Sequence, residues 1–416
     1  MEAVELGLRE ALMKDGRKLL EQLYNQPGLA VAGDASQPGE KRHPGRGKAV
    51  HTLFGEIRVA RNYYYHPEED CGRVPLDQAL GLVGSFSPGL VRLSARAAAK
   101  EGYESASDDL RVQAGVNIEG RQIQRLVNAV GRRVGDQLEQ GADRSTAPLP
   151  ILYLEADATG VPMVAAALEG RPGKQPDGSS KTREVKLGAV FTQTQTDEAG
   201  RPVRDPGSTT YVGSFEPAVD FGGRLRKEAR RRGLGRARKV VFLGDGAAWI
   251  WELARVNFPR AILILDLFHV LERLHTLCEG LYGEGSPWAI RMEENWAAML
   301  KNDHVGEVIA AARRRLADLS PGADPALAKQ IAYLENHQDK MLYKTYREQG
   351  LFYGSGVVEG GCRSVIGQRL KESGMFWTEE GATHLLNMRV ALKSNRWDEC
   401  WDQINNSNHL KTRVAA

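Results

Sequence analysis

Three acidic residues stand at the ends of short apolar or glycine-rich runs, and they constrain the fold more than any other feature of this chain. Asp157 and Asp245 each close an apolar run, and Glu359 lies in the glycine-rich segment 354–361, just ahead of a helix-like stretch. Short apolar runs bounded by Gly, Asp or Pro are typical of buried strands. Two carboxylates at the carboxyl ends of neighbouring strands, with a third on an adjacent helix, can hold a pair of Mg²⁺ ions for phosphodiester chemistry.

The residues around these acids carry a family resemblance. Segments 155–162 (EADATGVP), 242–251 (FLGDGAAWIW) and 354–359 (GSGVVE) resemble the three acidic motifs of bacterial insertion-sequence transposases of the ISKra group. Further matching segments are 52–55, 75–82 and 266–270, within a similarity that runs from about residue 48 to 400. The resemblance implies a DDE enzyme with a ribonuclease H-like core. In such an enzyme Asp157, Asp245 and Glu359 are catalytic and hold two Mg²⁺ ions, for which Mn²⁺ can substitute.

Two other acidic positions need a role. Glu155 and Asp157 are two residues apart, so on a strand both side chains point to the same face and either is a candidate metal ligand. The resemblance selects Asp157, because the family motif places its acid before a small residue and Thr-Gly. Asp266 and His269 form an Asp-x-x-His pair that offers too few ligands for a separate metal site. The resemblance marks the pair as an auxiliary motif that supports the site by hydrogen bonds or as outer neighbours of the ligands. The alternative is an ordinary buried histidine.

Charge is distributed unevenly along the chain, although the net charge is only +3. Segment 224–239 holds nine basic residues against one acidic residue, which suits phosphate contacts. A solvated helix face is the alternative, but the segment leads into the run ending at Asp245 and therefore favours DNA. The DNA contacts expected from this segment are Arg230, Arg231 and Arg232. Three more are expected close to the metals after Glu359, where helix-surface arginines are also common: Arg363, Arg369 and Lys371.

Cysteines and apolar runs limit the protein class. The four cysteines are scattered and form no Cys-x-x-Cys, which argues against a zinc ribbon and a disulfide framework and fits a reducing cytoplasm. Related transposases often carry a cysteine-rich zinc module near the amino end, and this sequence shows none. Segment 1–24 is interrupted by charges throughout, so we expect no signal peptide. Nowhere do about 18 apolar residues run together, so we expect no membrane span.

The amino-terminal third combines a helix, a hairpin and a helical unit. Five apolar residues recur at helical spacing and predict an amphipathic packing or dimerisation helix: Val4, Leu8, Leu12, Leu19 and Leu23. Segment 26–47 has the composition of a linker or basic loop, and segment 52–66 of a hairpin. Segments 105–114, 115–117 and 119–130 resemble a helix-turn-helix, with an ordinary helical hairpin as the alternative. Its outward side chains would be Arg121, Gln122, Gln124 and Arg125, of which Arg121 and Gln124 would contact bases.

The remaining chain predicts an α/β core split by helices. Strands are expected at 150–157, 161–168, 185–195, near 211, at 239–245 and at 261–266. Segment 286–349 predicts about three helices, and this block looks like the helical insertion of Mutator-like and related transposases. The expected domains are 1–47, an amphipathic helix and basic linker; 48–145, a DNA-binding hairpin and helical region; 146–280, the first part of a ribonuclease H-like core; 281–350, the insertion; and 351–416, the final core helices.

The resulting hypothesis is a DDE transposase that cleaves DNA and transfers strands with Mg²⁺. Its partners would be terminal inverted repeats, target DNA and at least one second copy, in the cytoplasm at the nucleoid and without a membrane. A ribonuclease H-like nuclease or resolvase without strand transfer is one alternative. A DNA-binding descendant of a transposase that has lost its chemistry is the other, and the intact acid triad speaks against it.

Overall fold

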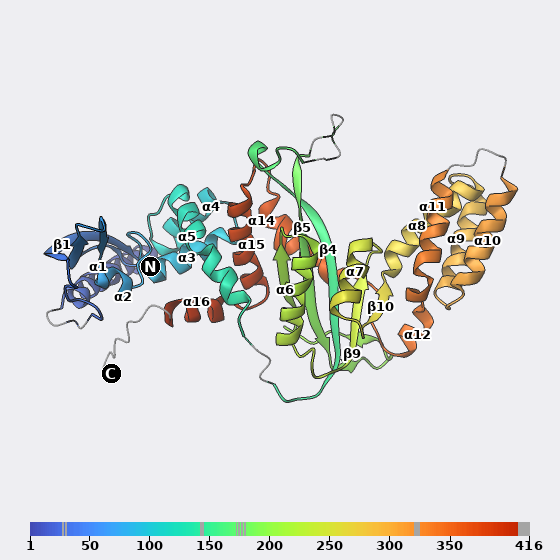
Figure 1. Cartoon of the computed structure of the whole chain (residues 1–416), viewed down its shortest axis with the longest axis horizontal. Helices are drawn as coiled ribbons and strands as arrows, with labels where there is room; N and C mark the ends of the chain where they lie inside the picture. Colours follow the sequence, from blue (N-terminus) through green and yellow to red (C-terminus); the bar gives the residue numbers. More distant parts are fainter. Residues whose placement is uncertain are drawn as a thin grey trace. The chain divides into compact units, whose positions relative to one another are not determined.

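The computed structural model describes residues 1–26, 29, 31–141, 145–171, 173, 175, 178, 180–319 and 325–406. The chain forms two compact units (Figure 1). The first combines Met1–Gln140 with Thr378–Ala416, and the second is Gly141–Trp377. No helix among the described residues has both the length and the apolar character needed to cross a membrane.

A five-stranded mixed sheet forms the centre of the second unit, in the order β10-β9-β4-β5-β8 (Figure 1). Its strands are β4 (Leu149–Pro162), β5 (Thr182–Gln193), β8 (Thr210–Ser214), β9 (Ala237–Gly244) and β10 (Ile262–Leu265). β4 pairs antiparallel with β5 and parallel with β9, and β10 pairs parallel with β9. The mixed α/β fold expected from the sequence is therefore confirmed.

Successive side chains of β4 point to opposite faces of the sheet and belong to two different apolar clusters. Leu152 and Leu154 face α6 (Ala218–Arg231) and α7 (Ala248–Asn257) in one apolar cluster. Tyr153 on the opposite face belongs to a cluster with Leu243 and the helices that follow β10. Because successive strand side chains point to opposite faces, Glu155 and Asp157 share the face of Tyr153.

The described residues between β10 and residue 349 are mainly helical. They are α8 (Leu267–Tyr282), α9 (Pro287–Leu300), α10 (Val305–Asp318), α11 (Pro325–His337), the short η3 (Gln338–Lys340) and α12 (Tyr343–Glu348). The Ser286 side chain accepts a hydrogen bond from the Ala289 amide, with Pro287 at the first helical position, so α9 begins at a strong start signal. Segment 287–348 thus holds helices where helices were expected.

A helical run that contains Glu359 follows. It consists of α13 (Gly356–Gly361), the π-helical turn η4 (Cys362–Gly367) and α14 (Gln368–Leu370). The strand expected at 161–168 is wrong. β4 continues through Pro162, and residues 165–167 form a 3₁₀ turn (η2, Ala165–Ala167) in which no residue is buried. Two short strands, β6 (Gln195–Thr196) and β7 (Pro202–Val203), pair with each other outside the main sheet.

The first unit begins with α1 (Glu2–Tyr24) and a three-stranded antiparallel sheet of β1 (Lys41–Thr52), β2 (Gly55–His66) and β3 (Cys71–Arg73). β1 corrects the expected linker, because residues 41–47 are strand rather than loop. These residues are mostly exposed and polar, and pairing with β2 rather than burial holds them. An irregularity between His43 and Arg46 accommodates Pro44, which has no amide hydrogen to donate.

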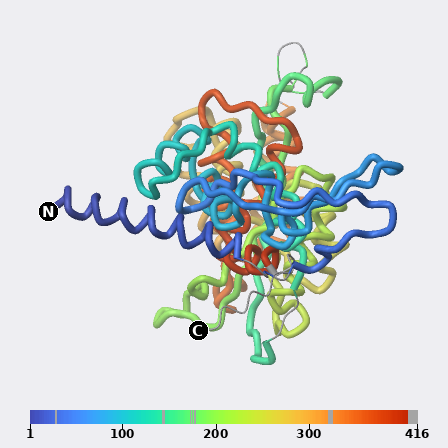
Figure 2. Tube along the Cα trace, turned by 90° about the vertical axis from the view of Figure 1, so that its left-hand side faces the viewer, coloured from blue at the N-terminus to red at the C-terminus, as the bar shows by residue number. Residues whose placement is uncertain are grey.

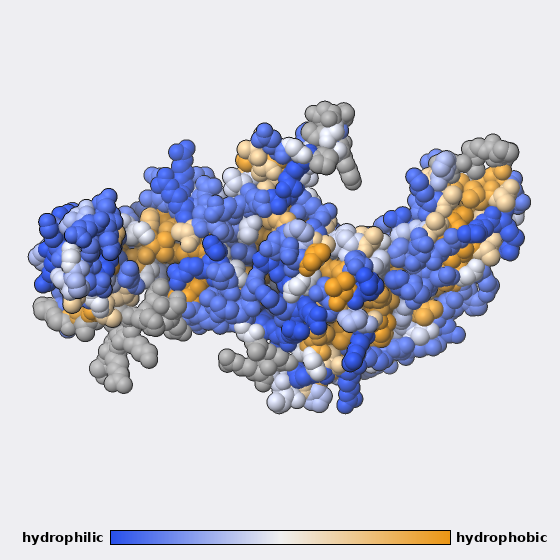
Figure 3. Space-filling view, in the orientation of Figure 1, coloured by the Kyte–Doolittle hydropathy of each residue, from blue (hydrophilic) through white to orange (hydrophobic). Residues whose placement is uncertain are grey.

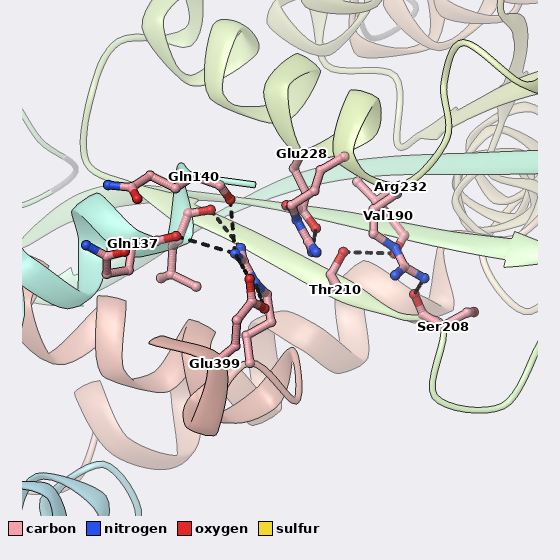
Figure 4. A network of polar contacts seen from close by, with 11 residues as sticks. Gln137, Gln140, Val190, Ser208, Thr210, Glu228, Arg232 and Glu399 are labelled. Carbon is pink, nitrogen blue, oxygen red and sulfur yellow. Dashed lines mark hydrogen bonds and ion pairs between the residues drawn. The ribbon is translucent and has the colours of Figure 1, made fainter. Parts of the chain in front are cut away.

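Helices complete the first unit: α2 (Pro75–Ala79), α3 (Pro88–Ala98), α4 (Tyr103–Asp109) with the π-helical turn η1 (Leu110–Ala114), α5 (Gly120–Leu138), α15 (Glu379–Lys393) and α16 (Trp397–Asn406). α15 and α16 pack on α5, so the expected assignment of residues 378–406 to the catalytic core is wrong. Arg389 donates to the Ala99 carbonyl at 2.6 Å, and Arg396 to the Leu138 carbonyl at 2.7 Å. Gln137, Gln140 and Glu399 lie around the Arg396 guanidinium (Figure 4).

Candidate active site

Strand register brings two of the predicted acids together. β4 and β9 are parallel hydrogen-bonded neighbours in which Glu155 lies opposite Leu243. Asp157 and Asp245 each follow that pair by two residues, so we expect them to be neighbours. The strand expected to end at Asp157 is longer than predicted, because β4 continues to Pro162, whereas Asp245 directly follows the end of β9. Adjacent strands lie about 4.8 Å apart, a distance that a shared cation can bridge. The Asp157 and Asp245 carboxylates each accept one hydrogen bond from a following backbone amide, of Ala158 and Ala247 respectively.

Close packing of α13 on the sheet brings the third acid to the strand that contains Asp157. α13 packs against β4 and β5, and its Gly361 lies against side chains of β5 and β8. A Cβ at Gly361 would lie 2.6 Å from Tyr211 Cε1 and 3.0 Å from Leu187 Cδ2, so only glycine allows this approach. The buried Glu155 carboxylate accepts a hydrogen bond of 2.6 Å from the Val358 amide. Glu155 therefore ties α13 to β4 beside Glu359.

Ser355 joins Glu359 to the Asp-x-x-His pair. The Ser355 hydroxyl lies 2.7 Å from Glu359 Oε1 and 2.8 Å from Asp266 Oδ2, and its backbone amide also donates to that Asp266 oxygen. Asp266 Oδ1 accepts from the His269 backbone amide at 2.9 Å and caps α8. His269 Nδ1 lies 3.4 Å from Asp266 Oδ1 and 3.9 Å from Glu359 Oε1. Asp266 is fully buried and both its oxygens are engaged, so it positions its neighbours.

The charges around Glu359 change the pKa values of two neighbouring groups. Burial raises the pKa of Glu155 to about 8, and the charges of Asp266 and Glu359 add to this. Hydrogen bonding to Asp266 raises the pKa of His269 to about 9, with help from the charges of Asp266, Glu359 and Asp245. The neighbouring carboxylates thus favour the protonated form of the His269 imidazole.

Two further groups extend the cluster to Asp157. Burial raises the pKa of the Cys362 thiol, and the charge of Asp157 and a hydrogen bond to it raise that pKa further. Burial opposes ionisation of Asp266, but hydrogen bonds from His269 and Ser355 outweigh burial and hold its pKa at about 2. The Tyr333 hydroxyl donates to the Asp245 carbonyl at 2.8 Å and anchors the end of β9.

One group of possible metal ligands lies close together among the described residues. It consists of Asp266, His269 and Glu359, whose ligand atoms lie within 4.8 Å of one another, and it includes one of the three predicted ligands but neither Asp157 nor Asp245. Glu155 Oε1 is buried without a hydrogen-bond partner among the described residues, as expected of an oxygen in a site that a cation or an ordered water completes. Carboxylate oxygens are the ligands that Mg²⁺ and Mn²⁺ prefer. The structure places Asp266 and His269 beside Glu359, and their supporting role stays a prediction.

The basic residues after Glu359 have different surroundings. Lys371 is exposed and its ammonium donates to the Thr159 hydroxyl, two residues beyond Asp157. Arg363 is exposed one helical turn after Glu359. Arg369 is completely buried against the Trp377 ring, and its guanidinium contacts the Met375 sulfur at 3.0 Å. The expected DNA contact at Arg369 is therefore wrong, because its guanidinium is inside the protein.

The basic segment 224–239 lies at the other end of the sheet. Its arginines follow α6 to the start of β9, and β9 spans about 25 Å at 3.3 Å per residue before it reaches Asp245. Arg231 is paired with the buried Glu228 carboxylate at 2.8 and 2.5 Å, and Arg232 donates to the Ser208 carbonyl at 2.8 Å (Figure 4). The DNA contacts expected at Arg231 and Arg232 are therefore wrong, because these guanidinium groups donate hydrogen bonds to acceptors within the fold. Arg230 is exposed.

The expected helix-turn-helix corresponds to α4 with η1, a turn and α5. Gly115 at the turn has φ 68°, and α5 buries Ile123, Leu126 and Val130. Arg121, Gln124 and Arg125 are exposed, as a DNA-reading face requires. Gln122 differs from expectation, because its side chain accepts from the Glu119 amide at 3.0 Å in a capping box.

Three contributors to the site carry no acidic side chain that the sequence alone would select: Ser355, Cys362 and Tyr333. Glu155, a candidate metal ligand by its position, instead accepts a hydrogen bond from the Val358 amide with one of its oxygens. Ser355 precedes Glu359 by one helical turn, a spacing that could have indicated the contact. The partners of Tyr333 and Cys362 are distant in sequence, so no local pattern could have shown them.

Comparisons with known proteins add two similarities. The profile of the Uncharacterised protein family (UPF0236) matches residues 2–171. No protein with a curated description matches the sequence significantly. Among solved structures, the chain is similar to the Drosophila P element transposase strand transfer complex, with a TM-score of 0.38 and 10% sequence identity over 76% of this chain and 94% of that chain. A likeness this distant carries no argument about chemistry, so function has to be inferred from the site.

Proposed function

We propose that this chain is a DDE transposase of an ISKra-like insertion sequence, with a ribonuclease H-like core and Mg²⁺-dependent chemistry. One observation carries the proposal. It is the parallel pairing of β4 with β9 up to Glu155 and Leu243, each two residues before an aspartate, together with the packing of α13, the helix of Glu359, against β4. The π-helical continuation of α13, η4, supports the reading, because π turns inside helices are frequent at functional sites.

The roles of the side chains follow from this arrangement. Asp157, Asp245 and Glu359 would hold two Mg²⁺ ions, which when bound would activate the attacking oxygen and stabilise the leaving oxygen of a phosphodiester. Glu155 and Ser355 hold the helix that bears Glu359, and Asp266 holds Ser355. Lys371 and Arg363 are exposed after Glu359, where a DNA phosphate approaching the acids would meet positive charge.

The partners of such an enzyme are DNA and a second copy of the chain. Terminal inverted repeats would be read by Arg121 and Gln124 on α5, whose side chains are exposed on the face opposite the buried one. Target DNA would receive the freed 3′-hydroxyl. Joining two element ends requires at least a dimer, and a bacterial cytoplasm with its nucleoid would be the location.

Isosteric acid variants test this proposal. Asp157→Asn, Asp245→Asn and Glu359→Gln should each abolish Mg²⁺-dependent cleavage of DNA that carries the element's ends, while circular dichroism and DNA binding stay unchanged. Asp220→Asn is the matched control, because Asp220 is an exposed acid on α6 at the opposite face of the sheet. Substantial cleavage by any one triad variant removes that residue from the site.

A strand-joining assay with a pre-cut end separates the alternatives. Transfer of the 3′ end into target DNA supports a transposase. Cleavage without joining supports a nuclease or resolvase, and binding without Mg²⁺-dependent cleavage supports a descendant that has lost the chemistry.

A further inference from the structure

The helix α1 lacks the burial that normally stabilises a helix. It spans 23 residues and none of them is buried, whereas the 19-residue α5 in the same unit buries seven. Most helical stability in proteins comes from packing of an apolar face. In Figure 2 the first turns of α1 project away from the other elements of its unit.

Contacts with the rest of the first unit use only one side of α1. Leu20 and Tyr24 pack against the apolar cluster of the small sheet. Arg9 donates to the Gln113 carbonyl at 2.6 Å, and Gly16 contacts the Phe54 ring. These positions lie on the side that carries residues 9, 13, 16, 20 and 24 at steps of three or four, and the adjoining side of the helix is exposed.

The exposed part of α1 carries an apolar stripe that polar residues interrupt. At 100° per residue its members fall within an arc of about 100°. They are Met1, Val4, Leu8, Leu12, Leu19 and Leu23, and they are between 43% and 99% exposed. Asp15 falls in the same arc and divides the stripe, which is roughly 34 Å long at about 1.5 Å per residue. Exposed apolar side chains gathered on one side of a helix are typical of an interaction site.

We propose that this stripe pairs antiparallel with the same stripe of a second copy of the chain. The distribution of charge along α1 favours a second copy of α1 as the partner and an antiparallel arrangement of the two helices. The first half of α1 carries Glu2, Glu5 and Glu10 against Arg9, and the second half carries Lys14, Arg17 and Lys18 against Asp15 and Glu21. Antiparallel pairing centred on Leu12 sets the acidic half against the basic half, with Glu5 near Lys18. Parallel pairing would set Glu5 on Glu5 and Lys18 on Lys18, which like charge disfavours.

The area is sufficient for a specific dimer. Six aliphatic side chains that each bury about 60–120 Å² would remove about 400–700 Å² of apolar surface per copy. Polar flanks add to this, and standard interfaces bury about 800 Å² per partner. The proposed transposase requires a second copy of the chain, and this pairing identifies the surface by which the two copies would bind. The pairing itself is inferred from α1 alone.

Oligomeric state without DNA tests the pairing. Sedimentation velocity of the full chain from about 0.5 to 50 μM should show a dimer, and Leu8→Glu with Leu12→Glu should give a monomer with unchanged circular dichroism. The matched control is Val219→Glu with Ile290→Glu, which places the same charges at exposed apolar positions elsewhere and should leave the dimer intact. A monomer throughout the range, or a dimer that survives the double α1 substitution, overturns the proposal. Neither result bears on cleavage, so this proposal and the proposed function can fail separately.

Cysteine cross-linking tests the direction. In a Cys71→Ser background, which removes the exposed native thiol, Val4→Cys and Leu19→Cys chains are oxidised separately and as a mixture. Antiparallel pairing predicts a disulfide-linked species only in the mixture, because Val4 of one copy lies near Leu19 of the other. Cross-linking of Val4→Cys with itself at equal or greater yield shows parallel pairing and refutes the arrangement.

Discussion

Gly361 is the position where a single methyl group should separate the third acid from the other two. In Gly361→Ala the new Cβ would lie 2.6 Å from Tyr211 Cε1 and 3.0 Å from Leu187 Cδ2, about 1 Å inside an ordinary contact. We expect α13 to move away from β5 and β8 by about that distance, and Glu359 to move with it. A displacement of 1 Å at a reacting group can cost about 100-fold in rate. We therefore expect Gly361→Ala to lower DNA cleavage about 100-fold.

Gly360→Ala is the matched control in the same helix. No atom lies within 4 Å of a Cβ at Gly360, so the substitution adds helix propensity without overlap and should stabilise by up to about 1 kcal/mol. Overpacking at Gly361 costs about 1–3 kcal/mol. Urea unfolding should therefore place Gly361→Ala about 1–3 kcal/mol below Gly360→Ala, while Gly360→Ala keeps wild-type cleavage.

A double substitution tests the cause. Tyr211→Ala removes the ring that the new methyl group would meet, so Gly361→Ala should cost less in that background than in the native chain. Wild-type cleavage by Gly361→Ala, or an equal cost in both backgrounds, would refute the reasoning that tight packing of α13 positions Glu359.

Three further predictions follow from named contacts. Arg231→Ala should lower the free energy of unfolding in urea by about 3 kcal/mol, because the buried Glu228 carboxylate loses its bidentate hydrogen bonds to Arg231. Arg230→Ala, at an exposed position, is the control and should change that free energy by less than about 0.5 kcal/mol. Equal effects of the two substitutions would show that the Glu228–Arg231 ion pair does not stabilise the fold. Arg121→Ala with Gln124→Ala should reduce the preference for element ends over random DNA by about 1–3 kcal/mol per lost base contact, measured by competition binding, and unchanged footprints on the ends would move recognition elsewhere. Ser355→Ala should raise the Mg²⁺ concentration for half-maximal cleavage about 10- to 100-fold, because Glu359 loses its tether to Asp266, and an unchanged Mg²⁺ titration would contradict this.

The strands that carry the two aspartates could be predicted because their signal is local. Each acid ends an apolar run, and burial of β4 and β9 on both faces makes such runs readable without long-range information. The strand β1 could not be predicted in the same way. Its residues 41–47 are polar, contain Pro44 and are held by pairing with β2, so hydrophobic pattern carries no signal there. The membership of α15 in the first unit depends on packing against a helix more than 240 residues earlier, which no local pattern encodes.

Local sequence also explains the environment of some arginines but not of others. The Glu228 and Arg231 pair is three residues apart on one helix, a spacing that predicts an ion pair and could have removed Arg231 from the DNA contacts. The burial of Arg369 could not be predicted from a local spacing, because it depends on contact with Trp377 and on how the chain turns after α14. Charge content alone therefore overstated the number of arginines available to DNA.

The acids near Glu359 are arranged in a way that stable packing alone does not favour. Burial raises the pKa of Glu155 to about 8, and the charges of Asp266 and Glu359 add to this. Backbone and hydroxyl hydrogen bonds stabilise the buried Asp266 carboxylate. Glu155 Oε1 has no hydrogen-bond partner among the described residues. Local features that break the rules of stable packing are expected at functional sites. A divalent cation bound beside Glu359 would favour the charged form of these carboxyl groups, so the arrangement agrees with the proposed metal site.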